Sequence, residues 1–132
     1  MTRRDGEKKI RLGLLGASNI AAKVLPSIRT VSEIEVVAVA AERPGAAEAF
    51  AKKHQIERFY GSYKECLADS NIDAVYISTL NNDHAAHIMQ SLESRKHVLC
   101  EKPLIPTRAE AETSFALAAK KKLVLLEGFM YR

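Results

Sequence analysis

Short apolar runs alternate along the chain with segments whose apolar residues recur at helical spacing. The runs are rich in Val, Ile and Leu and are too short to be helices on their own, so they predict β-strands. Strands are expected over residues 10–15, 34–41, 58–60, 73–79, 97–101 and 123–129. Helices are expected over residues 21–29, 44–54, 63–69, 83–94 and 107–121. Pro44 opens the second helix in this prediction, because the first helical turn tolerates proline.

The predicted strands are apolar almost throughout, which indicates that both faces of their sheet are buried. Strands that alternate with helices form parallel sheets, with helices on both faces. The sequence therefore predicts an α/β fold, a Rossmann-type doubly wound and mainly parallel sheet of about six strands. The domain is expected over residues 11–132, after a basic tail at residues 1–10.

Length and charge narrow the class of protein. The 132 residues suit a single domain with a genuine core, and 47% of them are hydrophobic. The net charge of +4 is concentrated at the start, because residues 1–11 carry five basic and two acidic side chains. The rest of the chain is nearly neutral and has no basic stripe with interleaved aromatic side chains, so no nucleic-acid partner is expected.

Neither export nor membrane insertion is expected. No apolar run is as long as a transmembrane helix, and no secretory signal precedes the first strand. The two cysteines, Cys66 and Cys100, match no zinc or redox spacing. A cytoplasmic location without a membrane partner is therefore the expectation.

The turn between the first strand and the first helix has small residues where a dinucleotide-binding turn needs them. Against the pattern G-x-G-x-x-G, the chain has Gly16, Ser18 and Ala21. Such a turn presents backbone N–H groups at a helix N-terminus to a pyrophosphate, and Ser18 adds a hydroxyl. An ordinary tight turn in which Ser18 caps the helix explains the same residues. In the dinucleotide interpretation, the cofactor contacts Gly16, Ala17, Ser18, Asn19 and Ile20.

The end of the second strand carries both signs of charge. In dinucleotide-binding folds a carboxylate here accepts hydrogen bonds from the ribose hydroxyls, whereas an arginine pairs with a 2′-phosphate. Glu42 and Arg43 stand together at this point, so both NAD and NADP remain open, with a slight preference for NAD from Glu42. The alternative is that both are exposed turn residues.

Two further strand ends carry polar residues. The fourth strand ends in the segment STLNNDH, and the fifth strand lies within KHVLCEKP. Both strands end at the carboxyl edge of the sheet, where open α/β folds bind ligands. Together with GLLGASNIA and the final EGFMYR, they make residues 11–132 resemble the Gfo/Idh/MocA oxidoreductases, most of all their dihydrodiol and xylose dehydrogenase branch. Leu80 departs from the proline that is usual in the family.

The resemblance implies roles for several residues. Lys102 would be the acid or base beside the nicotinamide, since a lysine whose pKa is lowered by burial and a cationic neighbour can exchange a proton near neutral pH. Glu101 would accept a hydrogen bond from the nicotinamide ribose. Further cofactor contacts are implied for Thr79, Leu80, Asn81, His84, Lys102 and Arg132.

The implied function is hydride transfer between NAD or NADP and a CH–OH group of a carbohydrate-like substrate: a sugar, polyol or dihydrodiol. The family's substrate-binding domain is absent from these 132 residues, so the isolated chain is expected to bind the dinucleotide without turnover. The alternative is a non-catalytic dinucleotide-binding module. Assembly into a homo-oligomer is left open as a further possibility. No metal site is expected. His84 and His87 share a helix face, but no carboxylate or thiolate at matching spacing joins them as a further ligand.

Overall fold

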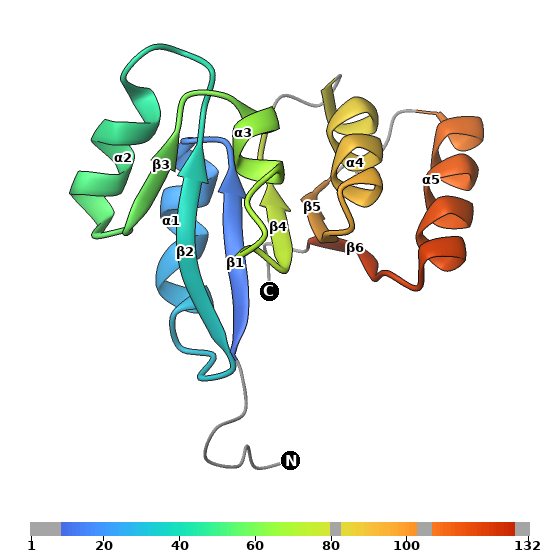
Figure 1. Cartoon of the computed structure of the whole chain (residues 1–132), viewed down its shortest axis with the longest axis horizontal. Helices are drawn as coiled ribbons and strands as arrows, with labels where there is room; N and C mark the ends of the chain where they lie inside the picture. The colour runs from blue at the N-terminus through green and yellow to red at the C-terminus, as the bar shows by residue number, and fades with distance from the viewer. Residues whose placement is uncertain (1–8, 80–82, 103–106, 129–132) are drawn as a thin grey trace.

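The computed structural model describes residues 9–79, 83–102 and 107–128 (Figure 1). Leu80, Asn81 and Arg132, which the sequence assigned to the cofactor, lie outside these residues. The strands are β1 (Ile10–Leu15), β2 (Ile34–Ala40), β3 (Arg58–Tyr60), β4 (Ala74–Ile77), β5 (His97–Glu101) and β6 (Leu125–Gly128). The helices are α1 (Asn19–Ile28), α2 (Ala46–His54), α3 (Tyr63–Leu67), α4 (His84–Glu93) and α5 (Arg108–Lys121). The predicted alternation of strands and helices is confirmed.

All six strands form one parallel sheet in the order β3-β2-β1-β4-β5-β6. The chain runs outward from β1 through β2 to β3, then returns to the other side of β1 and runs outward through β4, β5 and β6 (Figure 1). The direction of winding therefore switches between β1 and β4, where Leu15 pairs with Ile77. This strand order is that of the doubly wound nucleotide-binding fold, so the predicted fold class is confirmed.

Side chains of the strands enter separate hydrophobic cores on the two faces of the sheet. One core combines Leu14 and Tyr76 of the strands with side chains from α1 and α2. The other combines Leu15 and Ile77 with side chains from α3, α4 and α5. Helices therefore cover both faces, as the continuous apolar character of the strands predicts.

Both cysteines lie in the second of these cores. Cys66 and Cys100 are fully buried. Burial raises the pKa of each thiol to about 12. Both thiols therefore stay protonated near neutral pH and act as small apolar side chains.

Two helices begin two residues away from the predicted start, whereas α4 and α5 begin one residue later than predicted. α1 starts at Asn19, two residues early, because the Ser18 hydroxyl accepts a hydrogen bond from the Ala21 N–H at 3.0 Å and caps the helix. α2 starts after Gly45 and not at Pro44, because Gly45 has a left-handed backbone with φ of 78° that interrupts the helix. The early start of α1 brings its N-terminus directly to the turn after β1.

The helices of the described ranges are short. The longest, α5, has 14 residues, whereas a bilayer span needs about 20 apolar residues. Across the described ranges, no helix combines the length and the apolar character that crossing a membrane requires.

Candidate functional site

The turn after β1 requires a glycine. Gly16 has φ of 118°, a conformation that residues with a Cβ rarely adopt. A Cβ at this position would lie 2.8 Å from Ser78 Oγ and 3.3 Å from the Ser78 carbonyl carbon. The Gly16 N–H donates to the Ala40 carbonyl oxygen at 2.9 Å. The turn therefore lies close against the ends of both β2 and β4.

Ser18 holds the start of α1 in this turn. Its hydroxyl accepts a hydrogen bond from the Ala21 N–H and donates one to Ser78 Oγ at 2.8 Å. The helix cap that the sequence allowed is therefore present. Because the hydroxyl hydrogen is directed at Ser78, an anion at this position would instead meet backbone N–H groups of the first helical turn, which have no acceptor within a helix.

A cleft of about 580 Å³ opens beside this turn. Its wall combines the carboxyl ends of β1, β2 and β4 with the starts of α2, α3 and α4. Six lining residues are among those predicted from the sequence: Gly16, Ala17, Ser18, Glu42, Arg43 and Thr79. The others are Ala41, Ala46, Tyr63, Ser78, Asp83 and His87. The cleft thus lies at the switch point of the sheet, where open α/β folds bind their ligands.

Two predicted phosphate contacts lie outside the main cleft. Asn19 lines an adjoining hollow between α1 and α2. Ile20 is 38% exposed and lines neither hollow. A phosphate contact with these two residues would therefore use their backbone N–H groups at the start of α1.

The two histidines of α4 have different surroundings. His84, a predicted cofactor contact, is fully buried, and its Nε2 lies 3.0 Å from the Thr79 carbonyl oxygen. His87 lies one turn later and lines the cleft, with its Nδ1 2.8 Å from Thr79 Oγ1. The structure therefore buries His84 against the Thr79 carbonyl group and leaves His87 at the cleft.

Sequence reasoning did not select Tyr63, Ser78, Asp83 or His87 as site residues, although all four line the cleft. Tyr63 packs edge-to-face against His87, with the ring centroids 4.7 Å apart. Burial raises the pKa of Tyr63, and the carboxylates of Glu42 and Asp83 add to the shift, so its hydroxyl stays protonated. The available signal was positional, since Ser78 and Tyr63 follow closely on the ends of β4 and β3.

The end of β5 carries Glu101 and Lys102. The Glu101 carboxylate accepts a hydrogen bond from the hydroxyl of Tyr76, a fully buried residue of β4. Burial and the Glu101 carboxylate raise the pKa of Tyr76, so its hydroxyl remains a donor. Lys102 is exposed immediately after the strand. Tyr76 therefore holds the carboxylate at the sheet edge, a role that no sequence motif indicated.

A second kind of hollow, which is apolar, lies at the amino ends of the strands. A hollow of about 310 Å³ at the starts of β1, β2, β4 and β5 is lined mainly by apolar side chains, among them Ile10, Leu12 and Leu99. Within the described ranges, no group of three or more His, Cys, Asp or Glu side chains could hold a metal ion. A polar, phosphate-bearing ligand therefore fits the cleft at the carboxyl ends and not the apolar hollow.

Comparison with known proteins identifies the family of this chain. The profile of an oxidoreductase family with an NAD-binding Rossmann fold, Gfo/Idh/MocA, matches residues 10–129. The chain belongs to this family. It is 40% identical over 125 residues to dTDP-3,4-didehydro-2,6-dideoxy-alpha-D-glucose 3-reductase of Saccharopolyspora spinosa, covering 94% of this chain and 37% of that protein. It is 38% identical over 125 residues to trans-1,2-dihydrobenzene-1,2-diol dehydrogenase of Sus scrofa, and the match covers 93% of this chain and 37% of that protein.

A solved relative has the same fold. The 3-ketoreductase of Actinomadura kijaniata in complex with NADP and TDP-benzene superimposes with a TM-score of 0.87 and 37% identity, over 93% of this chain and 38% of that one. The family resemblance is thus confirmed, and the relatives include both a dihydrodiol dehydrogenase and a D-xylose 1-dehydrogenase. The chain spans 37% to 38% of the length of these relatives.

Proposed function

We propose that the cleft binds NAD or NADP with the pyrophosphate at residues 16–21, and that the chain is the dinucleotide-binding domain of an oxidoreductase. The glycine turn carries this proposal, because Gly16 brings the N-terminus of α1 to the switch point where the cleft opens. Free N–H groups and the helix dipole favour an anion there. Membership of an NAD-binding family supports the same cofactor.

The domain is proposed to extend over residues 11–132, after the tail at residues 1–10. Because the relatives are much longer, the complete reaction is expected to need further parts of a longer protein. The reductase and dehydrogenase relatives support hydride transfer between the nicotinamide and a CH–OH group of a sugar, polyol or dihydrodiol. The 132-residue chain by itself is expected to bind the cofactor without turnover.

Isothermal titration calorimetry of the chain with NAD⁺ and with NADP⁺ tests the binding site. At least one of them should bind with a Kd below about 1 mM. Gly16→Ala should abolish this binding, because the new Cβ meets Ser78 at 2.8 Å. Gly61→Ala is the matched control, since a Cβ there meets nothing within 4 Å. Absence of binding of both cofactors to the wild-type chain at millimolar concentration would contradict the proposal.

Cofactor preference is proposed to depend on Glu42 and Arg43, which both line the cleft after β2. The Glu42 carboxylate would accept a hydrogen bond from a ribose 2′-hydroxyl and repel a 2′-phosphate, whereas Arg43 would pair with the phosphate. Glu42 alone favours NAD slightly. The NADP in the Actinomadura kijaniata 3-ketoreductase does not support that preference, so the balance between the two side chains needs measurement.

Neutral variants of similar shape distinguish the contributions of Glu42 and Arg43 to cofactor preference. Glu42→Gln should raise the affinity for NADP⁺ about tenfold, and Arg43→Gln should lower it by about the same factor. Arg43→Gln should leave the affinity for NAD⁺ nearly unchanged. A tenfold preference of the wild-type chain for NADP⁺, about 1.4 kcal/mol, would show that Arg43 outweighs Glu42.

Lys102 is proposed as the proton-transfer residue of the longer protein, in line with the Glu-Lys-Pro motif. Lys102→Ala should lower kcat by about 10²- to 10⁴-fold, while cofactor affinity stays nearly unchanged because it rests on the glycine turn. Lys102→Arg should not restore the rate, because arginine keeps its proton at working pH. Equal kcat for wild type and Lys102→Ala would remove Lys102 from the mechanism.

A further inference from the structure

Three side chains form a wall between the cleft and a second hollow. Glu42, Tyr63 and His87 line the cleft beside the glycine turn, and the same three line an adjoining hollow of about 530 Å³ between α3 and α4. They come from three separate elements: the end of β2, the first residue of α3 and the first turn of α4. The adjoining hollow thus continues the cleft away from the glycine turn, past the end of β2.

His87 is held in a defined orientation in this wall. Its Nδ1 lies 2.8 Å from Thr79 Oγ1, and its ring packs against the Tyr63 ring at an interplanar angle of 68°. The hydroxyl and the tyrosine ring restrain the imidazole from two sides. Because Nδ1 is engaged by Thr79, Nε2 is the ring nitrogen left to meet a ligand in the cleft.

The charges around His87 make its protonation sensitive to conditions. Burial lowers the pKa of His87 below its usual 6.5, the carboxylates of Asp83 and Glu42 oppose that shift, and His84 adds to it. Tyr63, whose ring packs against the imidazole, has a raised pKa and stays neutral. His87 is therefore neutral at pH 7 and becomes a cation as the medium turns acidic.

We propose that His87 is a specificity residue for the cofactor, which shifts the preference from NAD towards NADP when it gains a proton. This inference rests on the proposed function. In doubly wound folds the end of β2 meets the ribose 2′ group. Glu42 supplies a negative charge there, and His87 shares its wall. A protonated His87 offsets that charge and attracts a 2′-phosphate, whereas a neutral His87 leaves Glu42 to favour a 2′-hydroxyl.

The test is calorimetric titration of the chain with NAD⁺ and NADP⁺ at about pH 4.5 and pH 8, and the acidic value lies well below the ordinary histidine pKa because burial lowers the pKa of His87. In the wild-type chain the ratio of NADP⁺ to NAD⁺ affinity should rise about fivefold at the acidic pH, the effect of one partly exposed charge contact. In His87→Gln, which stays neutral, that rise should disappear. The 2′-phosphate also titrates near pH 6, but it does so equally with every variant.

Two further variants control the experiment. His97→Gln removes a histidine at the start of β5, at the other end of the sheet, and should keep the wild-type rise. His87→Lys carries its charge at both pH values and should prefer NADP⁺ at pH 8 more strongly than wild type does. An equal rise in wild type and His87→Gln, with both cofactors bound, would overturn this inference alone. Failure of the wild-type chain to bind either cofactor would overturn the proposed function as well.

Discussion

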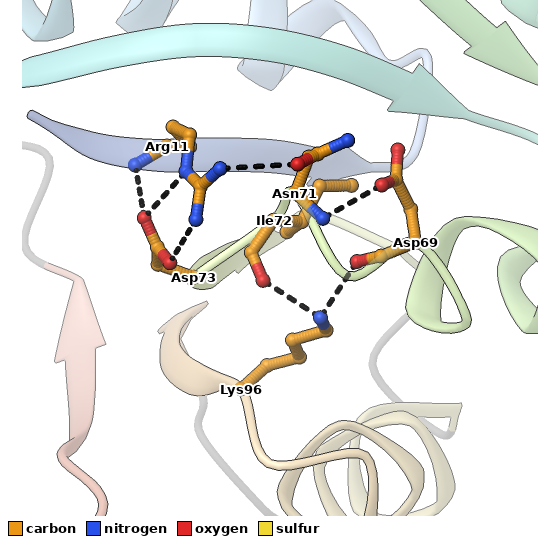
Figure 2. A network of polar contacts seen from close by, with 6 residues as sticks. All are labelled: Arg11, Asp69, Asn71, Ile72, Asp73 and Lys96. Carbon is orange, nitrogen blue, oxygen red and sulfur yellow. Dashed lines mark hydrogen bonds and ion pairs between the residues drawn. The ribbon is translucent and has the colours of Figure 1, made fainter.

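Polar side chains gather at both ends of the parallel sheet, but they are used differently at the two ends. At the amino ends they bond to one another (Figure 2). The Arg11 guanidinium donates to both carboxylate oxygens of Asp73, at 3.0 and 3.1 Å, and the Arg11 backbone N–H donates to the same carboxylate. Lys96, only 6% exposed, donates to the carbonyl oxygens of Asp69 and Ile72 at 2.8 and 2.7 Å.

At the carboxyl ends polar groups also bond to one another, but they border open space. Ser18 and Ser78 join the turn after β1 to the end of β4, and Thr79 and His87 continue the same wall. These groups leave a cleft of about 580 Å³ between them. The comparison shows that polar groups which satisfy each other hold the strands together, whereas polar groups arranged around a cleft can receive a ligand.

The largest effect is expected at the amino ends, from Lys96→Met. This variant removes a buried ammonium group together with its two hydrogen bonds, and leaves the buried Ile72 carbonyl and the partly buried Asp69 carbonyl without their donor. The free energy of unfolding in urea should fall by about 2–4 kcal/mol. Lys52→Met, at an exposed lysine paired with Glu48 on one helix, should cost less than about 0.5 kcal/mol. The cofactor affinity of folded Lys96→Met should equal that of wild type. A loss of binding would show that the amino-end network also affects the cofactor site.

The next effect is expected at the cleft, from Gly16→Ala. Positive φ and the contact with Ser78 should together lower the free energy of unfolding by about 1–3 kcal/mol. Gly45→Ala shares the positive φ, but its Cβ meets nothing within 4 Å, so it should cost about 1 kcal/mol. Cofactor binding should be lost in Gly16→Ala and kept in Gly45→Ala. If both variants bind equally well, the close approach to Ser78 does not matter for the site.

The amino-end network should also give the fold a dependence on acid. Burial raises the pKa of Asp69, but hydrogen bonds from Tyr60 and Asn71 and the charges of Arg58 and Lys96 outweigh it, so the pKa lies below 3.8. A carboxyl group with a lowered folded pKa stabilises the fold above its unfolded pKa, and this contribution is lost as the pH falls through the folded value. Urea unfolding below about pH 4 should therefore lose stability more steeply in wild type than in Asp69→Asn. If the free energy of unfolding falls equally with pH in wild type and in Asp69→Asn, groups other than Asp69 cause the acid sensitivity.

The smallest effect is expected at the turn between α4 and β5. Arg95 has φ of 64°, a left-handed conformation that glycine adopts without strain. Arg95→Gly should therefore raise the free energy of unfolding by about 0.5–1 kcal/mol. Lys23→Gly, inside α1, should lower it by about 1 kcal/mol, because glycine in a helix interior costs entropy. A destabilised Arg95→Gly would show that the arginine side chain contributes more than its backbone strain costs.

The sequence by itself determined the fold class and the position of the glycine turn. Apolar runs without polar positions indicate strands buried on both faces, and that inference requires only neighbouring residues. Gly16 could be recognised for the same reason, because a turn between a strand and a helix is a local feature. The start of α2 was missed by two residues because Pro44 and Gly45 both suit the beginning of a helix, and only the backbone angle of Gly45 distinguishes them.

The tertiary structure decided which polar side chains meet at the site. Ser18 donates a hydrogen bond to Ser78, 60 residues away, and Glu101 accepts one from the hydroxyl of Tyr76 on a neighbouring strand. His84 and His87 share one helix face, yet packing buries the first and leaves the second at the cleft. Backbone preferences and the period of apolar residues act over a few neighbours in the chain. The direction of a side chain at the sheet edge depends instead on how strands and helices distant in sequence pack together.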